Sequence, residues 1–124
     1  MLQKLALASA LIVLTAMPAL AADPAAGEKV FNKCKACHEV AKPQNKVGPH
    51  LVGIIGRQAG SVENFKYSDA MKNANIAWTE ENLTAYMKDP KDFVKGNKMA
   101  FAGLKKDEEI ADLLAYLQQA AGSS

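Results

Sequence analysis

Apolar side chains recur at helical spacing in several parts of the chain, and the clearest stripe lies near the C-terminus. Five residues there occupy one helix face at the i, i+3, i+4 and i+7 spacing: Ile110, Leu113, Leu114, Leu117 and Ala121. The stripe predicts a helix over residues 108–121. Asp107 is expected to cap its start, and Gly122 is expected to end it.

A second long helix is predicted directly after Asp23. Asp23 can act as the N-cap, Pro24 suits the first helical position, and apolar residues follow at helical spacing. The apolar face of the C-terminal helix needs a partner, and this earlier helix is the natural one. We expect Gly27 to admit the side chain of Tyr116 or Leu113 where the two helices cross.

Two shorter helices are predicted between these. Ser68 can cap a short helix that runs through Asn73. Thr79 can cap another, and acidic residues in its first turn favour it. The pair Asp89 and Pro90 should end that helix, because the residue before a proline avoids the helical conformation.

The remaining chain is predicted to be loop. Residues 43–60 contain four glycines and two prolines, and residues 91–104 contain Gly96 and Gly103 as breakers. No segment has the alternating pattern of a strand, so the fold class is all-α, small and loop-rich. A long loop in so small a domain needs partners for its backbone, and a ligand edge can supply them.

The first 21 residues have the pattern of a secretory signal peptide. They carry one lysine, then a short apolar run, and then Ala19 and Ala21, which satisfy the small-residue rule for cleavage before Ala22. Cleavage would leave residues 22–124 as a single domain exported to the periplasm. The alternative is that residues 1–21 stay attached as a membrane anchor.

The predicted first helix ends at the motif that carries the clearest chemistry. Cys34, Cys37 and His38 form a C-x-x-C-H sequence. This spacing indicates attachment of a c-type haem, in which both thiols add to the porphyrin vinyl groups and the histidine ligates the iron. Export agrees with this chemistry, because c-type haem is attached outside the cytoplasm.

Three other uses of two cysteines at this spacing fit the sequence less well. A thioredoxin-like redox motif belongs to a βαβ unit, and the chain shows no strand pattern. A zinc site lacks ligands, because His50 is the only other histidine and there is no second C-x-x-C pair. A structural disulfide would close a very small loop and leave His38 unexplained.

The sequence resembles the class I cytochromes c, in particular mitochondrial cytochrome c and its short soluble bacterial relatives. The resemblance covers essentially all of residues 22–124. It rests on motifs in this order: Cys34-x-x-Cys37-His38, Gly48-Pro49-x-Leu51, Gly56-Arg57-x-x-Gly60, Phe65-x-Tyr67-Ser68-Asp69-Ala70, Ile76-x-Trp78, Lys98-Met99-x-Phe101-Ala102-Gly103 and Leu113-x-Ala115-Tyr116-Leu117. It implies a small helical fold with crossed first and last helices around one covalent haem.

The iron needs a sixth ligand, and the chain offers Met71, Met87, Met99 and His50. Met99 is favoured, because it follows Gly96 in an irregular stretch that is free of a helix's fixed spacing. Met87 shares a helical stripe where core packing is the usual role of methionine. The resemblance agrees on Met99. His50 is expected to be an exposed loop residue.

The resemblance also implies supporting roles around the iron and the haem propionates. Pro49 would accept the Nδ1 proton of His38 through its carbonyl, and Tyr86 would lie near the Met99 sulfur. The propionates would be neutralised or hydrogen-bonded by three residues: Arg57, Tyr67 and Trp78.

Two positions depart from the family pattern. Asn97 stands where the family usually has threonine, and it could still hydrogen-bond a propionate. Met71 stands where the family usually has asparagine near a buried water, so the water network and the reduction potential are open to change.

The net charge says little about function, but the distribution of charged residues along the chain is informative. Without Lys4 the chain has 14 Lys and Arg against 13 Asp and Glu, which excludes a strongly basic nucleic-acid binder. Lysines flank the segments expected to frame the haem, whereas acidic residues gather at helix starts. Four lysines are expected to ring the exposed haem edge and meet acidic redox partners: Lys33, Lys91, Lys98 and Lys105.

These features together predict a soluble, monomeric, periplasmic one-electron carrier with heme c. Its partners would be an oxidase, a reaction centre, a bc1-type complex or a dehydrogenase. The alternative hypothesis is an enzyme such as a small haem peroxidase. Such an enzyme needs an open site on the iron, whereas this chain supplies a distal ligand. A membrane-tethered redox module is the third reading.

Overall fold

The computed structural model describes residues 3–13 and 21–124, and residues 21–124 hold all of its helices. In chain order these are α1 (Pro24–Phe31), α2 (Asp69–Lys72), α3 (Glu80–Lys88), α4 (Pro90–Phe93) and α5 (Asp107–Ala120). The described residues form no strand, only three isolated backbone bridges. The prediction of an all-α, loop-rich fold is confirmed.

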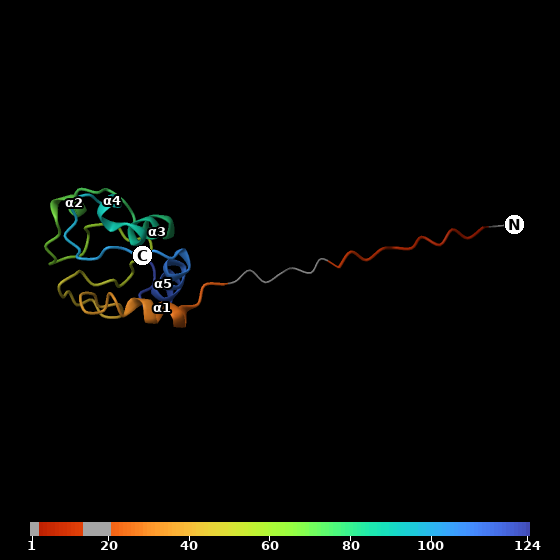
Figure 1. Cartoon of the computed structure of the whole chain (residues 1–124), viewed down its shortest axis with the longest axis horizontal. Helices are drawn as coiled ribbons and strands as arrows, with labels where there is room; N and C mark the ends of the chain where they lie inside the picture. The colour runs from red at the N-terminus through yellow and green to blue at the C-terminus, as the bar shows by residue number, and fades with distance from the viewer. Residues whose placement is uncertain (1–2, 14–20) are drawn as a thin grey trace.

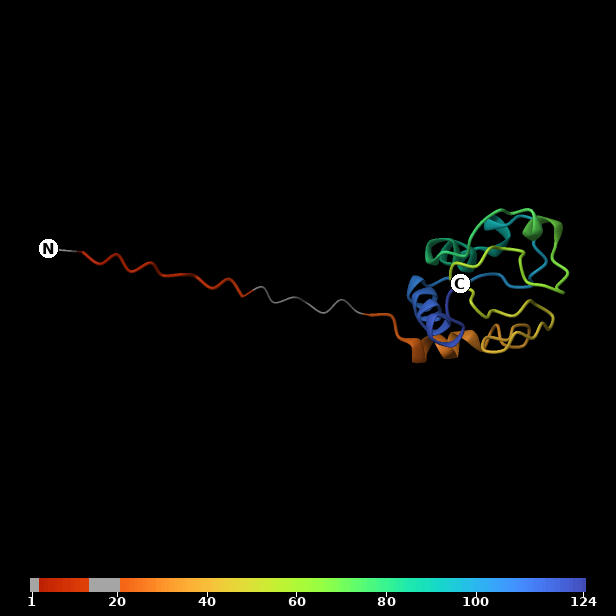
Figure 2. The ribbon, with the colours of Figure 1, turned by 180° about the vertical axis from the view of Figure 1, so that it is seen from behind.

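The helices lie on two sides of the domain. Helices α1 and α5 pack together on one side, and α2, α3 and α4 lie on the other, with long loops joining them (Figures 1 and 2). Helix α3 also contacts α5, so it links the two sides. The first and last helices are therefore partners, as their apolar stripes predict.

Helices α1 and α5 approach so closely at Gly27 that no side chain fits there. A Cβ atom on Gly27 would lie 2.5 Å from the carbonyl carbon of Asp112 and 2.9 Å from Cβ of Tyr116. The expectation that Gly27 receives a side chain is thus only partly right, because its nearest neighbour is the Asp112 backbone. Beside it, the Phe31 and Tyr116 rings pack with centroids 5.4 Å apart.

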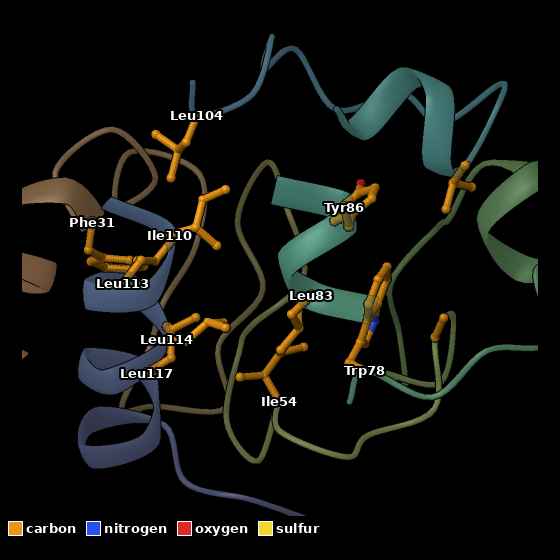
Figure 3. Packing of buried hydrophobic residues seen from close by; sticks show 12 residues of the cluster. Phe31, Ile54, Trp78, Leu83, Tyr86, Leu104, Ile110, Leu113, Leu114 and Leu117 are labelled. Atoms are coloured by element: carbon orange, nitrogen blue, oxygen red, sulfur yellow. The ribbon is translucent and has the colours of Figure 1, made fainter. Parts of the chain in front are cut away.

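The core lies between α5, α3 and the loops. Leu104, Ile110 and Leu113 are 2% exposed or less, and Leu83 and Tyr86 of α3 belong to the same buried cluster (Figure 3). Trp78 stacks beside Tyr86 with ring centroids 4.8 Å apart. The amphipathic stripe of α5 is therefore buried as predicted.

Helix boundaries follow local chemistry. The side chains of Asp23, Ser68 and Thr79 each accept a backbone N–H as N-caps, as predicted. Asp107 does not cap α5: it is the first residue of the helix, and its carboxylate lies 3.0 Å from Lys88 Nζ. The N-cap is Lys106, which makes no side-chain capping bond.

A short helix, α4, was not predicted. Pro90 ends α3, but it also suits the first position of a new helix, and Asp89 caps that helix by accepting the Asp92 N–H at 3.2 Å. The predicted loop over residues 91–104 is therefore wrong over its first three residues.

Residues 3–13 contain no helix or strand, and their apolar side chains are exposed, Leu5 by 92% and Leu7 by 95%. Part of the predicted signal peptide, including Ala19, lies outside the described residues. Within the described part of the chain, no helix has the length and apolar character needed to cross a membrane.

Candidate haem-binding site

The C-x-x-C-H motif lies directly after α1 and keeps a tight turn. The N–H groups of Cys37 and His38 both donate to the Cys34 carbonyl, at 3.1 and 3.0 Å. Both cysteines are half-buried and free. Burial raises the pKa of the Cys34 thiol, and the neighbouring Cys37 adds to the shift. Two thiols thus lie one turn apart on one segment.

His38 is held in one orientation. Its Nδ1 lies 2.7 Å from the carbonyl oxygen of Pro49, so Nδ1 carries the hydrogen and Nε2 is left as the free lone pair. Gly48 packs on the ring, since a Cβ there would lie 2.8 Å from His38 Nδ1. Burial lowers the pKa of His38 more than the hydrogen bond to Pro49 raises it, and Arg57 and Lys46 lower it further, so the neutral ligating form is favoured.

Met99 lies in the irregular segment after α4 and contacts Tyr86. The Tyr86 hydroxyl donates to the Met99 sulfur at 3.9 Å. Tyr86 is buried, which raises its pKa to about 12, so the phenol keeps its proton and remains a donor. The structure thus brings together two residues that are thirteen positions apart in the chain.

The other candidates for an iron ligand differ from Met99 in their polar contacts. Met71 and Met87, like Met99, are partly buried and pack against the core, but within the described part of the chain only Met99 has a hydrogen bond to its sulfur. His50 is half-buried, not exposed as expected, and its Nδ1 accepts the Val52 N–H at 3.2 Å. Its carbonyl accepts a bond from Arg57. These contacts give each residue a role within the protein.

Arg57 has one polar atom without a partner. Its Nη1 donates to the carbonyls of His50 and Val52, at 2.9 and 3.1 Å. Its Nε is buried and has no hydrogen-bond partner among the described residues. A buried N–H of a guanidinium is costly to leave unpaired, and it suits an acidic group. This orphaned donor fits a haem propionate.

Tyr67 and Trp78 lie in the same part of the fold as Arg57. The Tyr67 hydroxyl accepts the Val62 N–H at 3.1 Å, and the Tyr67 hydrogen remains available for another acceptor. The backbone N–H of Trp78 donates to the Arg57 carbonyl at 2.8 Å, and Trp78 is only 5% exposed. The backbone therefore ties Trp78 directly to Arg57.

The loop that carries Arg57 is held by the C-terminal tail. Ser124 donates through its N–H to the Ile55 carbonyl at 2.9 Å and through its hydroxyl to the Gly53 carbonyl at 2.5 Å. The Gly53 N–H donates to Ala121 at 2.7 Å. These long-range bonds were not predicted, because no local pattern signals which carbonyls a chain end will meet.

Two cavities border the site. One of about 510 Å³ is lined by His38 together with Lys35, Glu39 and Lys46. The other, about 420 Å³, is lined by Arg57, His50 and Glu63, among others. Met99 lines neither of these two cavities.

Comparison with known proteins identifies the fold. The family model described as Cytochrome c matches residues 24–121. The chain belongs to the cytochrome c family. Cytochrome c2 of Blastochloris viridis is 44% identical over 119 residues, which cover 95% of this chain and 94% of that protein. Cytochrome c-550 of Nitrobacter winogradskyi is 53% identical over 98 residues, or 78% of this chain and 90% of the relative.

A solved structure agrees. Cytochrome cH from Methylobacterium extorquens superimposes with a TM-score of 0.74 at 42% identity, covering 78% of this chain and 98% of that one. The predicted class I cytochrome c resemblance is thereby confirmed. Membership of the cytochrome c family implies covalent heme c, and Cys34 and Cys37 stand at the required spacing.

Asn97 is the site residue whose contacts differ most from those expected of a cytochrome c residue beside a propionate. Both hydrogens of its amide are already used, one by the Pro90 carbonyl at 2.8 Å and one by the Val94 carbonyl at 2.9 Å. Its Oδ1 accepts the Met99 N–H at 2.9 Å. A propionate would have to displace one of these bonds.

Proposed function

We propose that this cytochrome c is a soluble periplasmic one-electron carrier whose haem is bound covalently by Cys34 and Cys37 and ligated by His38 and Met99. One observation carries the proposal. The 2.7 Å contact between His38 Nδ1 and the Pro49 carbonyl leaves Nε2 as the only free lone pair of a histidine next to two free thiols.

His38 acts as the proximal ligand in this proposal. Its Nδ1–H is anchored on Pro49, and a hydrogen bond from this position makes the imidazole more basic at Nε2. A Cβ atom at Gly48 would overlap the ring, so the glycine leaves room for the imidazole in this orientation. The neutral form that a metal needs is already favoured by burial, which lowers the pKa of His38.

Met99 acts as the distal ligand. A soft, neutral thioether stabilises ferrous over ferric iron, so this ligand raises the reduction potential. When bound, the haem supplies reversible one-electron chemistry. Tyr86 holds the Met99 sulfur by its hydroxyl, and this donation withdraws electron density from the sulfur.

Arg57, Tyr67 and Trp78 are proposed to hold the propionates. The buried Nε of Arg57, which has no partner within the described residues, is the donor that supports this role best. The hydroxyl of Tyr67 has its hydrogen available as well. Charge neutralisation at this position stabilises buried carboxylates.

The proposed coordination argues against an enzyme. His38 and Met99 would together supply the two protein ligands of the haem iron, and a substrate would then have no free site on the iron. A peroxidase-like reaction would need the release of Met99, which its contact with Tyr86 opposes. Electron transfer needs no such release.

Export is proposed from the leader. Residues 1–21 have the signal-peptide pattern, and the match to cytochrome c2 of Blastochloris viridis covers 95% of this chain, so it extends into the leader. The mature protein would comprise residues 22–124. A membrane-tethered module is the alternative if the leader stays attached, and the mass of the native protein distinguishes the two.

Four lysines are proposed to form the docking surface, a set hereafter called the lysine frame. Lys33, Lys91, Lys98 and Lys105 are all exposed and form no ion pair with another described residue. Free positive charges on the surface attract acidic redox partners, such as an oxidase, a reaction centre, a bc1-type complex or a dehydrogenase. The carrier is proposed to act as a monomer.

A spectroelectrochemical titration of the purified holoprotein tests the proposed function. The expected result is one reversible transition with a one-electron slope. A further requirement is that neither redox state binds added peroxide or consumes it. An irreversible titration, or rapid peroxide turnover by the wild-type protein, would favour the enzyme alternative.

A further inference from the structure

We infer that Asn97 is a positioning residue that fastens the backbone of Met99 to helix α4. The inference rests on the proposed function, because Met99 is there the distal ligand. It replaces the propionate contact expected of Asn97 by a role in holding the ligand-bearing segment.

The side chain of Asn97 makes three hydrogen bonds and joins three parts of the chain. Its amide nitrogen donates to the carbonyls of Pro90 and Val94, the first residue and the C-cap of α4. Its Oδ1 accepts the N–H of Met99, two residues ahead, which is the geometry of an Asx-turn. One side chain therefore connects both ends of α4 to Met99.

The orientation of the amide follows from its partners. A backbone N–H can only donate, so the atom facing Met99 must be the oxygen. Two carbonyls can only accept, so the atom facing Pro90 and Val94 must be the nitrogen. The three bonds are mutually consistent, and they use both donors of the amide.

Met99 depends on Asn97 because its segment has few other backbone bonds. From residue 98 to residue 103, the N–H of Met99 is the only backbone N–H with a partner in the part of the chain that the structure describes. The backbone is next tied down at Leu104, whose N–H donates to the Met87 carbonyl at 2.8 Å. Asn97 and the Tyr86 hydroxyl thus hold Met99 from opposite ends of the residue.

The support beneath Asn97 is rigid. Pro90 belongs to the most fully buried side chains and Val94 is 6% exposed, so α4 is anchored in the core. The Val94 N–H also donates to Pro90, at 3.1 Å, which closes the turn. A thioether fastened to such a support is harder to move away from iron than one on a free loop.

Asn97→Ala removes all three bonds, and Asn97→Thr keeps at most one acceptor and one donor. The ferric holoproteins are titrated with imidazole, which competes with a thioether for the distal position. Loss of about one net hydrogen bond in the Met99-bound arrangement predicts about tenfold tighter imidazole binding for Asn97→Ala, equivalent to about 1.4 kcal/mol. Asn97→Thr should lie between this variant and wild type.

Asn82 provides a matched control. Its amide also donates to a backbone carbonyl, that of Ala77, at 2.8 Å, but it lies in the first turn of α3 and forms no hydrogen bond with the described residues around Met99. Asn82→Ala should lose stability against denaturant while its imidazole affinity stays within twofold of wild type. Comparison of the Asn97 and Asn82 variants therefore distinguishes a loss of Met99 positioning from a general loss of stability.

The outcomes are distinct. Equal imidazole affinity in wild type, Asn97→Thr and Asn97→Ala would overturn the inference, as would an equal gain in Asn82→Ala. A change only in the pH dependence of the reduction potential would overturn it in favour of a propionate contact. If wild-type protein lacks the ferric thioether charge-transfer band before imidazole is added, the proposed function itself fails, and this result is visible without any variant.

Discussion

The close contact of α1 and α5 makes Gly27→Ala a sharp test of the fold. A Cβ atom at this position would lie 2.5 Å from the Asp112 carbonyl carbon and 2.9 Å from Tyr116 Cβ. Since the first of these atoms is backbone, it cannot rotate away, and the two helices must separate. The added methyl group would therefore strain the interface on which the core depends.

The magnitude is a balance of two opposed effects. Alanine is favoured over glycine in a helix by about 0.5–1 kcal/mol. Overpacking a well-packed interface costs about 1–3 kcal/mol, and a backbone neighbour places this site near the upper end. The net loss in the free energy of unfolding should be about 2–2.5 kcal/mol, which lowers Tm by roughly 8–20 °C in a domain of this size.

Thermal and denaturant unfolding of the holoproteins, followed by far-ultraviolet circular dichroism, measure this loss. Glu28→Ala is the matched control, because it introduces the same residue at the next, exposed position of α1. Its stability should change by less than about 0.5 kcal/mol. If Gly27→Ala were as stable as wild type, the backbones of α1 and α5 would not be in the described contact.

Three further predictions concern charge and titration. Asp112→Ala should cost about 0.5–1.5 kcal/mol of stability, because Asp112 Oδ1 accepts the Asp23 N–H at 2.8 Å, whereas Asp112→Asn keeps an acceptor and should cost less. Burial, aided by Glu28, raises the pKa of Tyr116 in the folded protein. The protonated phenol therefore adds to the free energy of unfolding fully below about pH 10, and this stabilisation is lost as the pH rises further. The difference in unfolding free energy between wild type and Tyr116→Phe should therefore shrink in alkaline titrations; a constant difference would contradict this. Lys98→Glu should slow electron transfer to an acidic partner at low salt more than Lys72→Glu does, and the difference should vanish as salt screens the charges; equal effects at all ionic strengths would mean that the lysine frame does not steer docking.

Local patterns predicted the elements whose cause is local. The stripe of α5 and the caps Asp23, Ser68 and Thr79 depend on residues a few positions apart, and the structure has them where the pattern places them. Helix α4 was not predicted because Pro90 can end one helix and also begin the next. Only Asp89, which acts as the N-cap of α4, indicates that a second helix begins there.

The contacts of the candidate site were harder to predict, because they depend on the fold. Nothing in the sequence indicates that the Asp112 backbone faces Gly27, or that the amide of Asn97 meets two carbonyls of α4. The C-x-x-C-H motif could be recognised because attachment chemistry fixes its spacing. The contact of His38 with Pro49 follows the pattern that the family resemblance implied.

The optical spectrum of the purified protein, recorded before and after reduction, tests whether its haem is ligated by His38 and Met99. We expect a low-spin c-type spectrum in both states, with a ferric thioether charge-transfer band that disappears in Met99→Ala. A high-spin spectrum, or a band that persists in Met99→Ala, would contradict the proposed ligation by His38 and Met99. Haem that acidified solvent extracts from the chain would contradict the proposed covalent attachment through Cys34 and Cys37.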